Sequence, residues 1–204
     1  MTRILFFSLL IGLFFSACQS GTNNNEATTS ATVEANKASD KSNQSSTAER
    51  LLKSANGNAE VAKVAEGISS VIGSNMISTI DFSNGQLTLN YFGSADDYNT
   101  ALANEKQKMN AGSFEQYWNT GSRAEKTFCS AAGEVLKNHE FVKSVKVVLP
   151  TGKQSMNGMV DRDGLSKITG KSWKELVADW DVQFTNGIVR IPAGRAKFMK
   201  AFMD

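Results

Sequence analysis

The sequence predicts an α+β fold in which a largely antiparallel sheet, built from about three β-hairpins, is covered on one face by helices. Short runs of alternating apolar residues occur in pairs, and turn-forming residues join the members of each pair. Between these pairs lie segments whose apolar residues recur at helical spacing. Hairpins separated by helices are typical of an antiparallel sheet with one covered face.

The first helix and the first hairpin are expected near the start of this pattern. Apolar residues recur at steps of three, four and seven over residues 61–72, and Asn58 can cap this helix. Residues 77–82 and 86–92 then read as two strands on either side of Asn84-Gly85, and Asn-Gly is a strong hairpin signal.

Three helices are expected before the second hairpin. Ser94 can cap the first of them, and residues 114–118 form a single aromatic turn that follows it. Ser122 and Glu125 have the spacing of a capping box for the third helix, which should bury the apolar residues among 128–136.

The second hairpin is expected from residues 145–149 and 154–160, because both runs alternate and a Pro-Thr-Gly turn lies between them. Asp163 can then start a short helix. Ser172 and Glu175 form a candidate capping box for a second short helix.

A third hairpin is expected from residues 182–184 and 188–191 around Asn186-Gly187, followed by a last helix that Pro192 opens. Residues 182–191 resemble residues 80–89, with the Phe, Asn and Gly of both segments in register. Independent convergence of two hairpins on Asn-Gly is the favoured interpretation, and an internal duplication is the alternative.

The first 17 residues have the organisation of a signal peptide. Arg3 precedes a largely apolar stretch from Ile4 to Phe15, which has the length of a signal-peptide core and is too short to cross a bilayer as a stable helix. The following Phe15-Ser16-Ala17-Cys18 resembles the lipobox of bacterial lipoproteins, with Phe in place of the usual Leu. This resemblance implies cleavage before Cys18 and attachment of acyl chains such as palmitate to that residue, which would anchor the protein to a membrane.

Residues 18–50 are expected to be a disordered tether, and residues 51–204 a single α+β domain. Residues 19–47 contain 16 Ser, Thr or Asn among 29 positions, so they cannot bury enough apolar surface to order the chain. The protein is therefore expected in the cell envelope. Gln19 favours the outer membrane, facing the periplasm or the surface, because lipoproteins retained at the inner membrane commonly have Asp there.

The net charge bears on binding of nucleic acid, and the cysteine content bears on internal disulfides. The net charge of +2 gives no preference for nucleic acid. The chain has two cysteines, and if Cys18 carries lipid, Cys129 has no partner for an internal disulfide.

The candidate catalytic and metal-binding patterns are all incomplete, so no catalytic, cofactor-binding or metal-binding residue is assigned. Cys129 and His139 lie ten residues apart on one predicted helix and cannot pair within it, which favours a buried thiol and an imidazole at a helix end. Residues 164–172 have one residue too many for a phosphate-binding loop. Residues 161–164 lack the further ligands of a calcium loop, and the methionines lack clustered His or Cys for copper.

These exclusions favour a non-catalytic binding or interaction module of the cell envelope, whose partner is an envelope protein or a small apolar ligand. Surplus aromatic residues suggest an apolar ligand, although ordinary packing in the core is the favoured interpretation of them; they are Phe114, Tyr117, Trp118, Trp173 and Trp180.

Three alternatives stay open. One is an envelope enzyme that uses carboxylates such as Glu115, Asp161 or Asp163, and another is a purely structural envelope protein. The third concerns residues 195–203, which combine cationic and apolar side chains. Packing of this last helix on the domain's own sheet is the favoured interpretation, and a position on a membrane or a partner is the alternative.

Overall fold

The computed structural model describes residues 47–55, 57–69, 71–103, 108–151 and 154–203. All of them belong to one compact unit, Ala38–Asp204. The predicted signal peptide, the predicted lipid-bearing Cys18 and most of the predicted tether lie outside the described residues.

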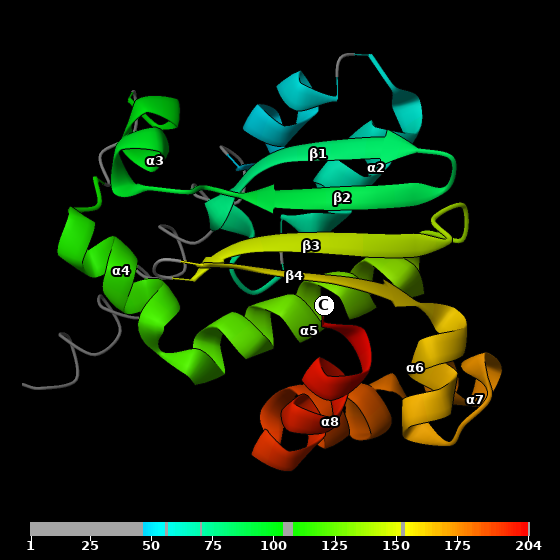
Figure 1. Cartoon of the computed structure of the whole chain (residues 1–204). Helices are drawn as coiled ribbons and strands as arrows, with labels where there is room; N and C mark the ends of the chain where they lie inside the picture. Colours follow the sequence, from blue (N-terminus) through cyan, green and yellow to red (C-terminus); the bar gives the residue numbers. More distant parts are fainter. Residues whose placement is uncertain (1–46, 56, 70, 104–107, 152–153, 204) are drawn as a thin grey trace, which may run out of the picture. The chain divides into compact units, whose positions relative to one another are not determined.

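Helices and strands alternate in groups along the described chain (Figure 1). Residues 47–54 are helical. The further elements are α2 (Ala59–Ile68), the 3₁₀ turn η1 (Ser74–Met76), β1 (Ile77–Ser83), β2 (Gln86–Tyr91), α3 (Ala95–Ala101), α4 (Ala111–Asn119), α5 (Gly121–Asn138), β3 (Ser144–Thr151), β4 (Gln154–Asp161), α6 (Arg162–Thr169), α7 (Trp173–Ala178), the π-helix η2 (Asp181–Arg190) and α8 (Pro192–Phe202).

The four strands form one mixed sheet in the order β1-β2-β3-β4. The pairs β1–β2 and β3–β4 are antiparallel hairpins, whereas β2 and β3 run parallel. The α+β class is therefore confirmed, and the largely antiparallel sheet of three hairpins is corrected to a mixed sheet of two. The connection through α3, α4 and α5 explains the parallel pair, because it returns the chain to the end of the sheet at which β2 began.

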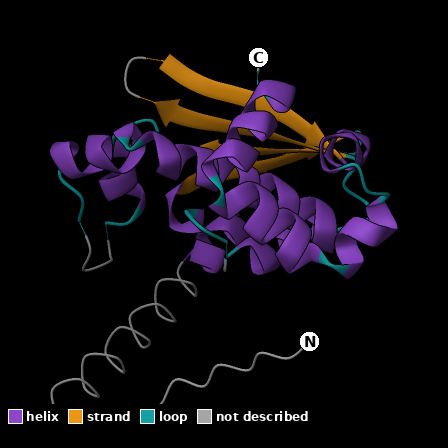
Figure 2. Ribbon diagram, turned by 90° about the horizontal axis from the view of Figure 1, so that it is seen from below, coloured by secondary structure: helices purple, strands orange, loops and turns teal. Residues whose placement is uncertain are grey.

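One face of the sheet is covered by helices (Figure 2). Alternate residues of the two central strands are buried against them, namely Leu87, Leu89 and Tyr91 in β2 and Val145, Val147 and Leu149 in β3. The residues between them in β2 and β3 are only partly buried and include Thr88, Asn90 and Lys146. This alternation is the pattern of a sheet with one packed and one open face.

Both hairpins of the sheet were predicted from the sequence. Asn84 and Gly85 have φ angles of 54° and 83°, so they form the two-residue turn with both central residues in the left-handed region. The turn of the second hairpin includes residues 152–153, which lie outside the described residues.

The third predicted hairpin is wrong, because residues 181–190 form the π-helix η2. Trp180, Phe184 and Ile188 are buried at four-residue steps, whereas Val182 and Asn186, which would share their face in a strand, are exposed. Val182 and Ile191, which the hairpin would have used as apolar strand residues, are at least half exposed. Burial of one helical face thus outweighs the turn preference of Asn-Gly.

The predicted starts of α4 and α5 also differ from the structure. The aromatic turn over 114–118 is part of the longer helix α4, which Asn110 caps by accepting a hydrogen bond from the Ser113 N–H at 2.8 Å. The capping box of Ser122 and Glu125 does not form, since α5 begins at Gly121 after Thr120 with no side-chain cap. By contrast, the caps predicted at Asn58 and Ser94 and the capping box predicted at Ser172 are present.

Residues 47–50, which the sequence assigned to the tether, are helical. Thr47 is buried, and the Arg50 guanidinium donates to the carbonyls of Asn75, Ile77 and Ser78 where β1 begins. Helical structure therefore extends at least four residues before the predicted domain boundary at residue 51.

Candidate functional site

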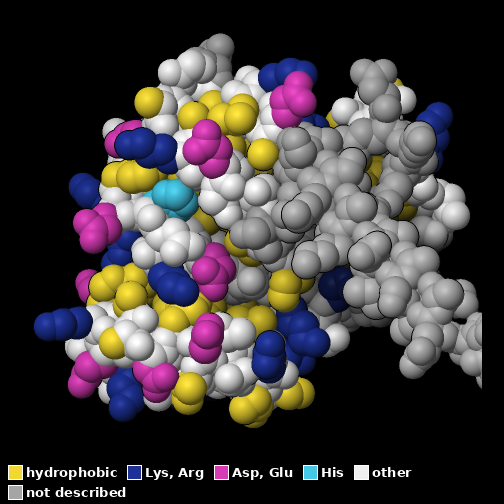
Figure 3. Space-filling view, turned by 180° about the vertical axis from the view of Figure 1, so that it is seen from behind, with side chains coloured by type: hydrophobic (Ala, Val, Ile, Leu, Met, Phe, Trp, Pro, Cys, Tyr) yellow, Lys and Arg dark blue, Asp and Glu magenta, His cyan; other side chains and the backbone are white. Residues whose placement is uncertain are grey.

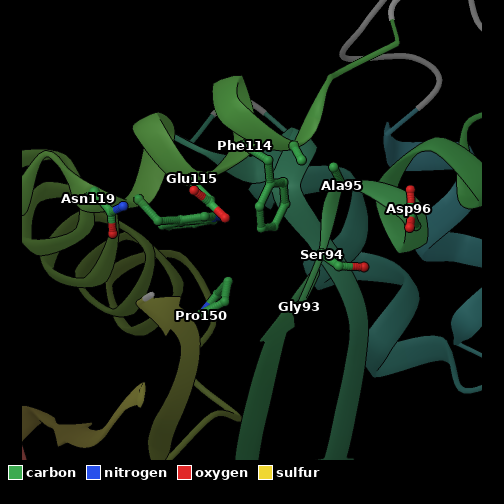
Figure 4. Close-up of a pocket in the computed structure, with 10 residues that line it drawn as sticks. Gly93, Ser94, Ala95, Asp96, Phe114, Glu115, Asn119 and Pro150 are labelled. Atoms are coloured by element: carbon green, nitrogen blue, oxygen red, sulfur yellow. The ribbon is translucent and has the colours of Figure 1, made fainter. Parts of the chain in front are cut away.

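A pocket of about 430 Å³ opens at the carboxyl ends of the two parallel strands, β2 and β3 (Figure 4). Its walls come from the loop after β2, the start of α3, one side of α4 and the end of β3. The lining residues are Gly93, Ser94, Ala95, Asp96, Ala111, Phe114, Glu115, Trp118, Asn119 and Pro150. The volume of the pocket is within the range of small-molecule sites.

The apolar wall of the pocket is the edge of the protein core. Phe114 and Trp118 lie one helical turn apart on α4 with ring centroids 6.5 Å apart, and both are almost fully buried. Trp118 also meets the rings of Tyr91 and Tyr117 edge to face, with centroids 5.5 and 4.8 Å away. This packing fixes the aromatic wall, which a rigid ligand site requires.

The polar groups of the pocket do not form a catalytic pair. The Ser94 hydroxyl accepts from the Asp97 N–H and donates to the Asp97 carboxylate at 2.8 Å, so it is engaged in capping α3. The Glu115 carboxylate points over the pocket between Phe114 and Pro150, whereas Asp96 lies on the α3 side beyond Ser94 (Figure 4). These groups can orient a ligand by hydrogen bonding.

Two buried polar groups belong to the aromatic side chains at and behind this wall. The Tyr91 hydroxyl and the Trp118 indole N–H have no hydrogen-bond partner among the described residues. Burial, followed by the nearby Tyr117, raises the pKa of Tyr91 well above its usual range. Tyr91 therefore stays neutral and cannot act as a base near neutral pH.

The predicted candidate carboxylates are not brought together. Glu115 lines the pocket just described, whereas Asp161 and Asp163 line a groove at β4, α6 and α8. Asp161 caps α6 by accepting from the Gly164 N–H at 2.7 Å, so the cap predicted at Asp163 lies two residues earlier. Among the described residues, no three His, Cys, Asp or Glu side chains are placed to hold a metal ion.

Cys129 is a buried thiol on α5, as predicted, and burial is the main reason that its pKa is raised. His139 caps the C-terminal end of that helix, and burial lowers its pKa.

Arg162, whose role no local sequence pattern indicates, donates to carbonyls at this helix end. Its Nη2 lies 2.8 and 2.9 Å from the carbonyl oxygens of Leu136 and His139, and its Nη1 lies 2.6 Å from that of Val142.

The five aromatic residues proposed for an apolar ligand divide between two places. Phe114 and Trp118 line the pocket, and Tyr117 packs behind them. Trp180 instead stacks on Phe184 with centroids 4.3 Å apart, and its indole N–H donates to the Glu134 carboxylate at 2.7 Å. Trp173 meets Trp180 edge to face. These last two tryptophans therefore belong to the packing of α7 and η2 on α5.

The surface seen from behind the sheet carries interspersed acidic and basic side chains of the described residues (Figure 3).

In α8, Arg195 does not contribute to a cationic surface, because it is buried and its guanidinium lies 3.0 Å from the Glu125 carboxylate. Within the described residues, no helix has the length and apolar character needed to cross a membrane.

The comparisons with known proteins leave the site to be interpreted from its own geometry. No protein-family model matches the chain, and no curated protein or solved structure is significantly similar to it.

Proposed function

We propose that the protein is a lipoprotein of the cell envelope, anchored through Cys18, whose domain binds a small and largely apolar ligand without catalysis. The observation that carries the binding role is the pocket at the carboxyl ends of β2 and β3. It combines a packed aromatic wall with a few polar groups at its rim, which is the usual composition of small-molecule sites.

The polar rim supports binding rather than reaction. The Ser94 hydroxyl is engaged with Asp97, and Glu115 and Asp96 lie on different sides of the pocket. The ligand expected here has an apolar body that contacts Phe114 and Pro150, with a hydrogen-bond donor that reaches the Glu115 carboxylate.

Titration of the full chain with N-phenyl-1-naphthylamine, an uncharged apolar fluorophore, tests the pocket. Ala111→Phe places a large side chain at the pocket wall and is expected to weaken binding about tenfold or more. Ser113→Phe is the matched control, because Ser113 is exposed on the same helix and does not line the pocket. Absence of binding to the parent protein, or an equal effect of both substitutions, would contradict the assignment.

Anchoring is tested separately with Cys18→Ser. The variant is expected to lose acylation, processing before residue 18 and fractionation with membranes. If it still fractionates with membranes and is still cleaved at the same bond, the lipoprotein assignment is wrong, whatever the pocket binds.

A further inference from the structure

A second groove, of about 670 Å³, lies beside β4 and between α6 and α8. Figure 1 shows both helices next to this outer strand of the sheet. Its apolar lining includes Met159, Ile168 and Phe202. Met159 is half exposed, and methionine side chains adapt readily to different apolar partners.

Two carboxylates and two ammonium groups line the same groove. Asp161 and Asp163 come from the junction of β4 and α6, Lys167 from the next turn of α6, and Lys197 from α8. All four side chains are exposed. In the described part of the chain neither lysine forms a salt bridge, since the bridges found there join Lys53 to Glu49 and Arg195 to Glu125.

The groove therefore combines an apolar lining with two carboxylates and two ammonium groups, and neither lysine forms a salt bridge with a described residue. A singly charged ligand would leave two of these charges unmatched. Electrostatic complementarity favours a ligand that carries one positive and one negative group on an apolar body.

The strand beside the groove can also recognise an extended backbone. β4 is an edge strand, and Met203, just after α8, already pairs with Gly158 on it through an antiparallel bridge. Beyond this bridge β4 continues to Asp161, and an extended peptide can add to that part of the edge strand.

We propose that this groove binds a short apolar peptide with free termini, which lies extended beside β4. Its terminal ammonium faces Asp161 and Asp163, its terminal carboxylate faces Lys167 and Lys197, and its side chains contact Met159 and Phe202. This proposal does not depend on the ligand of the first pocket.

Calorimetric titration of the full chain with trileucine at low ionic strength tests the proposal. N-acetyl trileucine and trileucine amide, which each lack one terminal charge, are expected to bind about two- to fivefold more weakly, as exposed charge pairs imply. Triglycine, which has both charges and no apolar side chains, is expected to bind much more weakly than either.

Two substitutions assign each end of the peptide. Lys197→Gln is expected to weaken trileucine binding about two- to fivefold and to leave the affinity for trileucine amide unchanged. Asp163→Asn is expected to weaken trileucine binding by the same factor and to leave the affinity for N-acetyl trileucine unchanged. Both residues are exposed and cap no helix, so these variants are expected to fold. Lys171→Gln is the matched control, because Lys171 is exposed and does not line the groove.

Several outcomes would overturn the peptide site. One is absence of trileucine binding, and another is an affinity for both blocked peptides that equals the affinity for trileucine. The last is binding of zwitterionic lysophosphatidylcholine without binding of trileucine. Ala111→Phe, which alters the first pocket, is expected to leave trileucine affinity unchanged. Loss of trileucine binding in that variant would place the peptide in the first pocket and would also refute the proposal.

Discussion

Replacement of Gly133 by alanine tests how η2 packs on α5. Gly133 is buried in the middle of α5, and a Cβ atom there would lie 2.3 and 2.4 Å from two ring carbons of Phe184 and 3.2 Å from the Trp180 ring. Carbon atoms in contact are normally about 3.5–4 Å apart. The Phe184 ring would therefore have to move by about 1 Å, although it is buried and stacked on Trp180.

Two opposing effects decide the magnitude. Alanine is favoured over glycine in a helix interior by about 1 kcal/mol. Overpacking of a well-packed core costs about 1–3 kcal/mol, and the upper end applies because Trp180 and Phe198 hold the Phe184 ring. The net expectation for Gly133→Ala is a loss of about 2 kcal/mol in the free energy of unfolding.

Urea and thermal unfolding measure this change. A loss of 2 kcal/mol corresponds to a decrease in Tm of roughly 4–8 °C for a protein of this size. Gly121→Ala is the control at the start of the same helix, because a Cβ there meets no atom within 4 Å, and it is expected to be neutral or slightly stabilising. If Gly133→Ala is as stable as the parent protein, Phe184 does not pack on α5 as described. Phe184→Leu in the Gly133→Ala background should recover part of the loss.

Three further predictions follow from the contacts described above. Arg162→Met should lower the free energy of unfolding by about 3 kcal/mol, because three backbone carbonyls lose a donor, and a change below about 1 kcal/mol in urea unfolding would contradict this. Asp161→Ala should cost about 1 kcal/mol through loss of the α6 cap, and Asp163→Ala less than about half of that; equal losses would place the cap elsewhere. Because burial lowers the folded-state pKa of His139, the unfolded state binds more protons below about pH 6.5. The free energy of unfolding should therefore fall as the pH decreases through that value toward the folded-state pKa. This fall should be smaller in His139→Gln. If the urea midpoints of the two proteins are identical across this range, the assignment is wrong.

The sequence predicted the elements whose signals are local. The Asn84-Gly85 turn, the Ser172–Glu175 capping box and the start of α8 at Pro192 depend on residues close together in the chain, and all are present. The parallel pairing of β2 with β3 could not be predicted in this way, because it depends on where the intervening helices return the chain.

The error at residues 182–191 has a different cause. Residues 80–89 and 182–191 have the same Phe, Asn and Gly, yet the first segment is a hairpin and the second is mainly the π-helix η2. The difference lies in the neighbours. Gly133 lets Phe184 approach α5, and the Arg195 side chain donates to the carbonyls of Val189 and Arg190 at the end of η2. Neither contact is visible in the local sequence.

The candidate site could be predicted only in part. Phe114, Trp118 and Glu115 were singled out as aromatic or acidic residues, and the structure places all three at one pocket. The sequence around Pro150 indicates only a turn, because the place of Pro150 in the pocket depends on the parallel pairing. The groove beside β4 joins residues of α6 and α8, so its combination of charges emerges only once these helices pack together.

The parallel ladder also has a consequence for the order in which the chain folds. Each hairpin can form from neighbouring residues, but Leu87 meets Val145 only after the whole α3–α5 connection has been closed. Closing so long a segment costs conformational entropy before any contact between the hairpins compensates for it. Docking of the two hairpins should therefore be the slow event, and backbone amides of β2 that bond to β3 should gain protection from hydrogen exchange later in refolding than those that bond to β1.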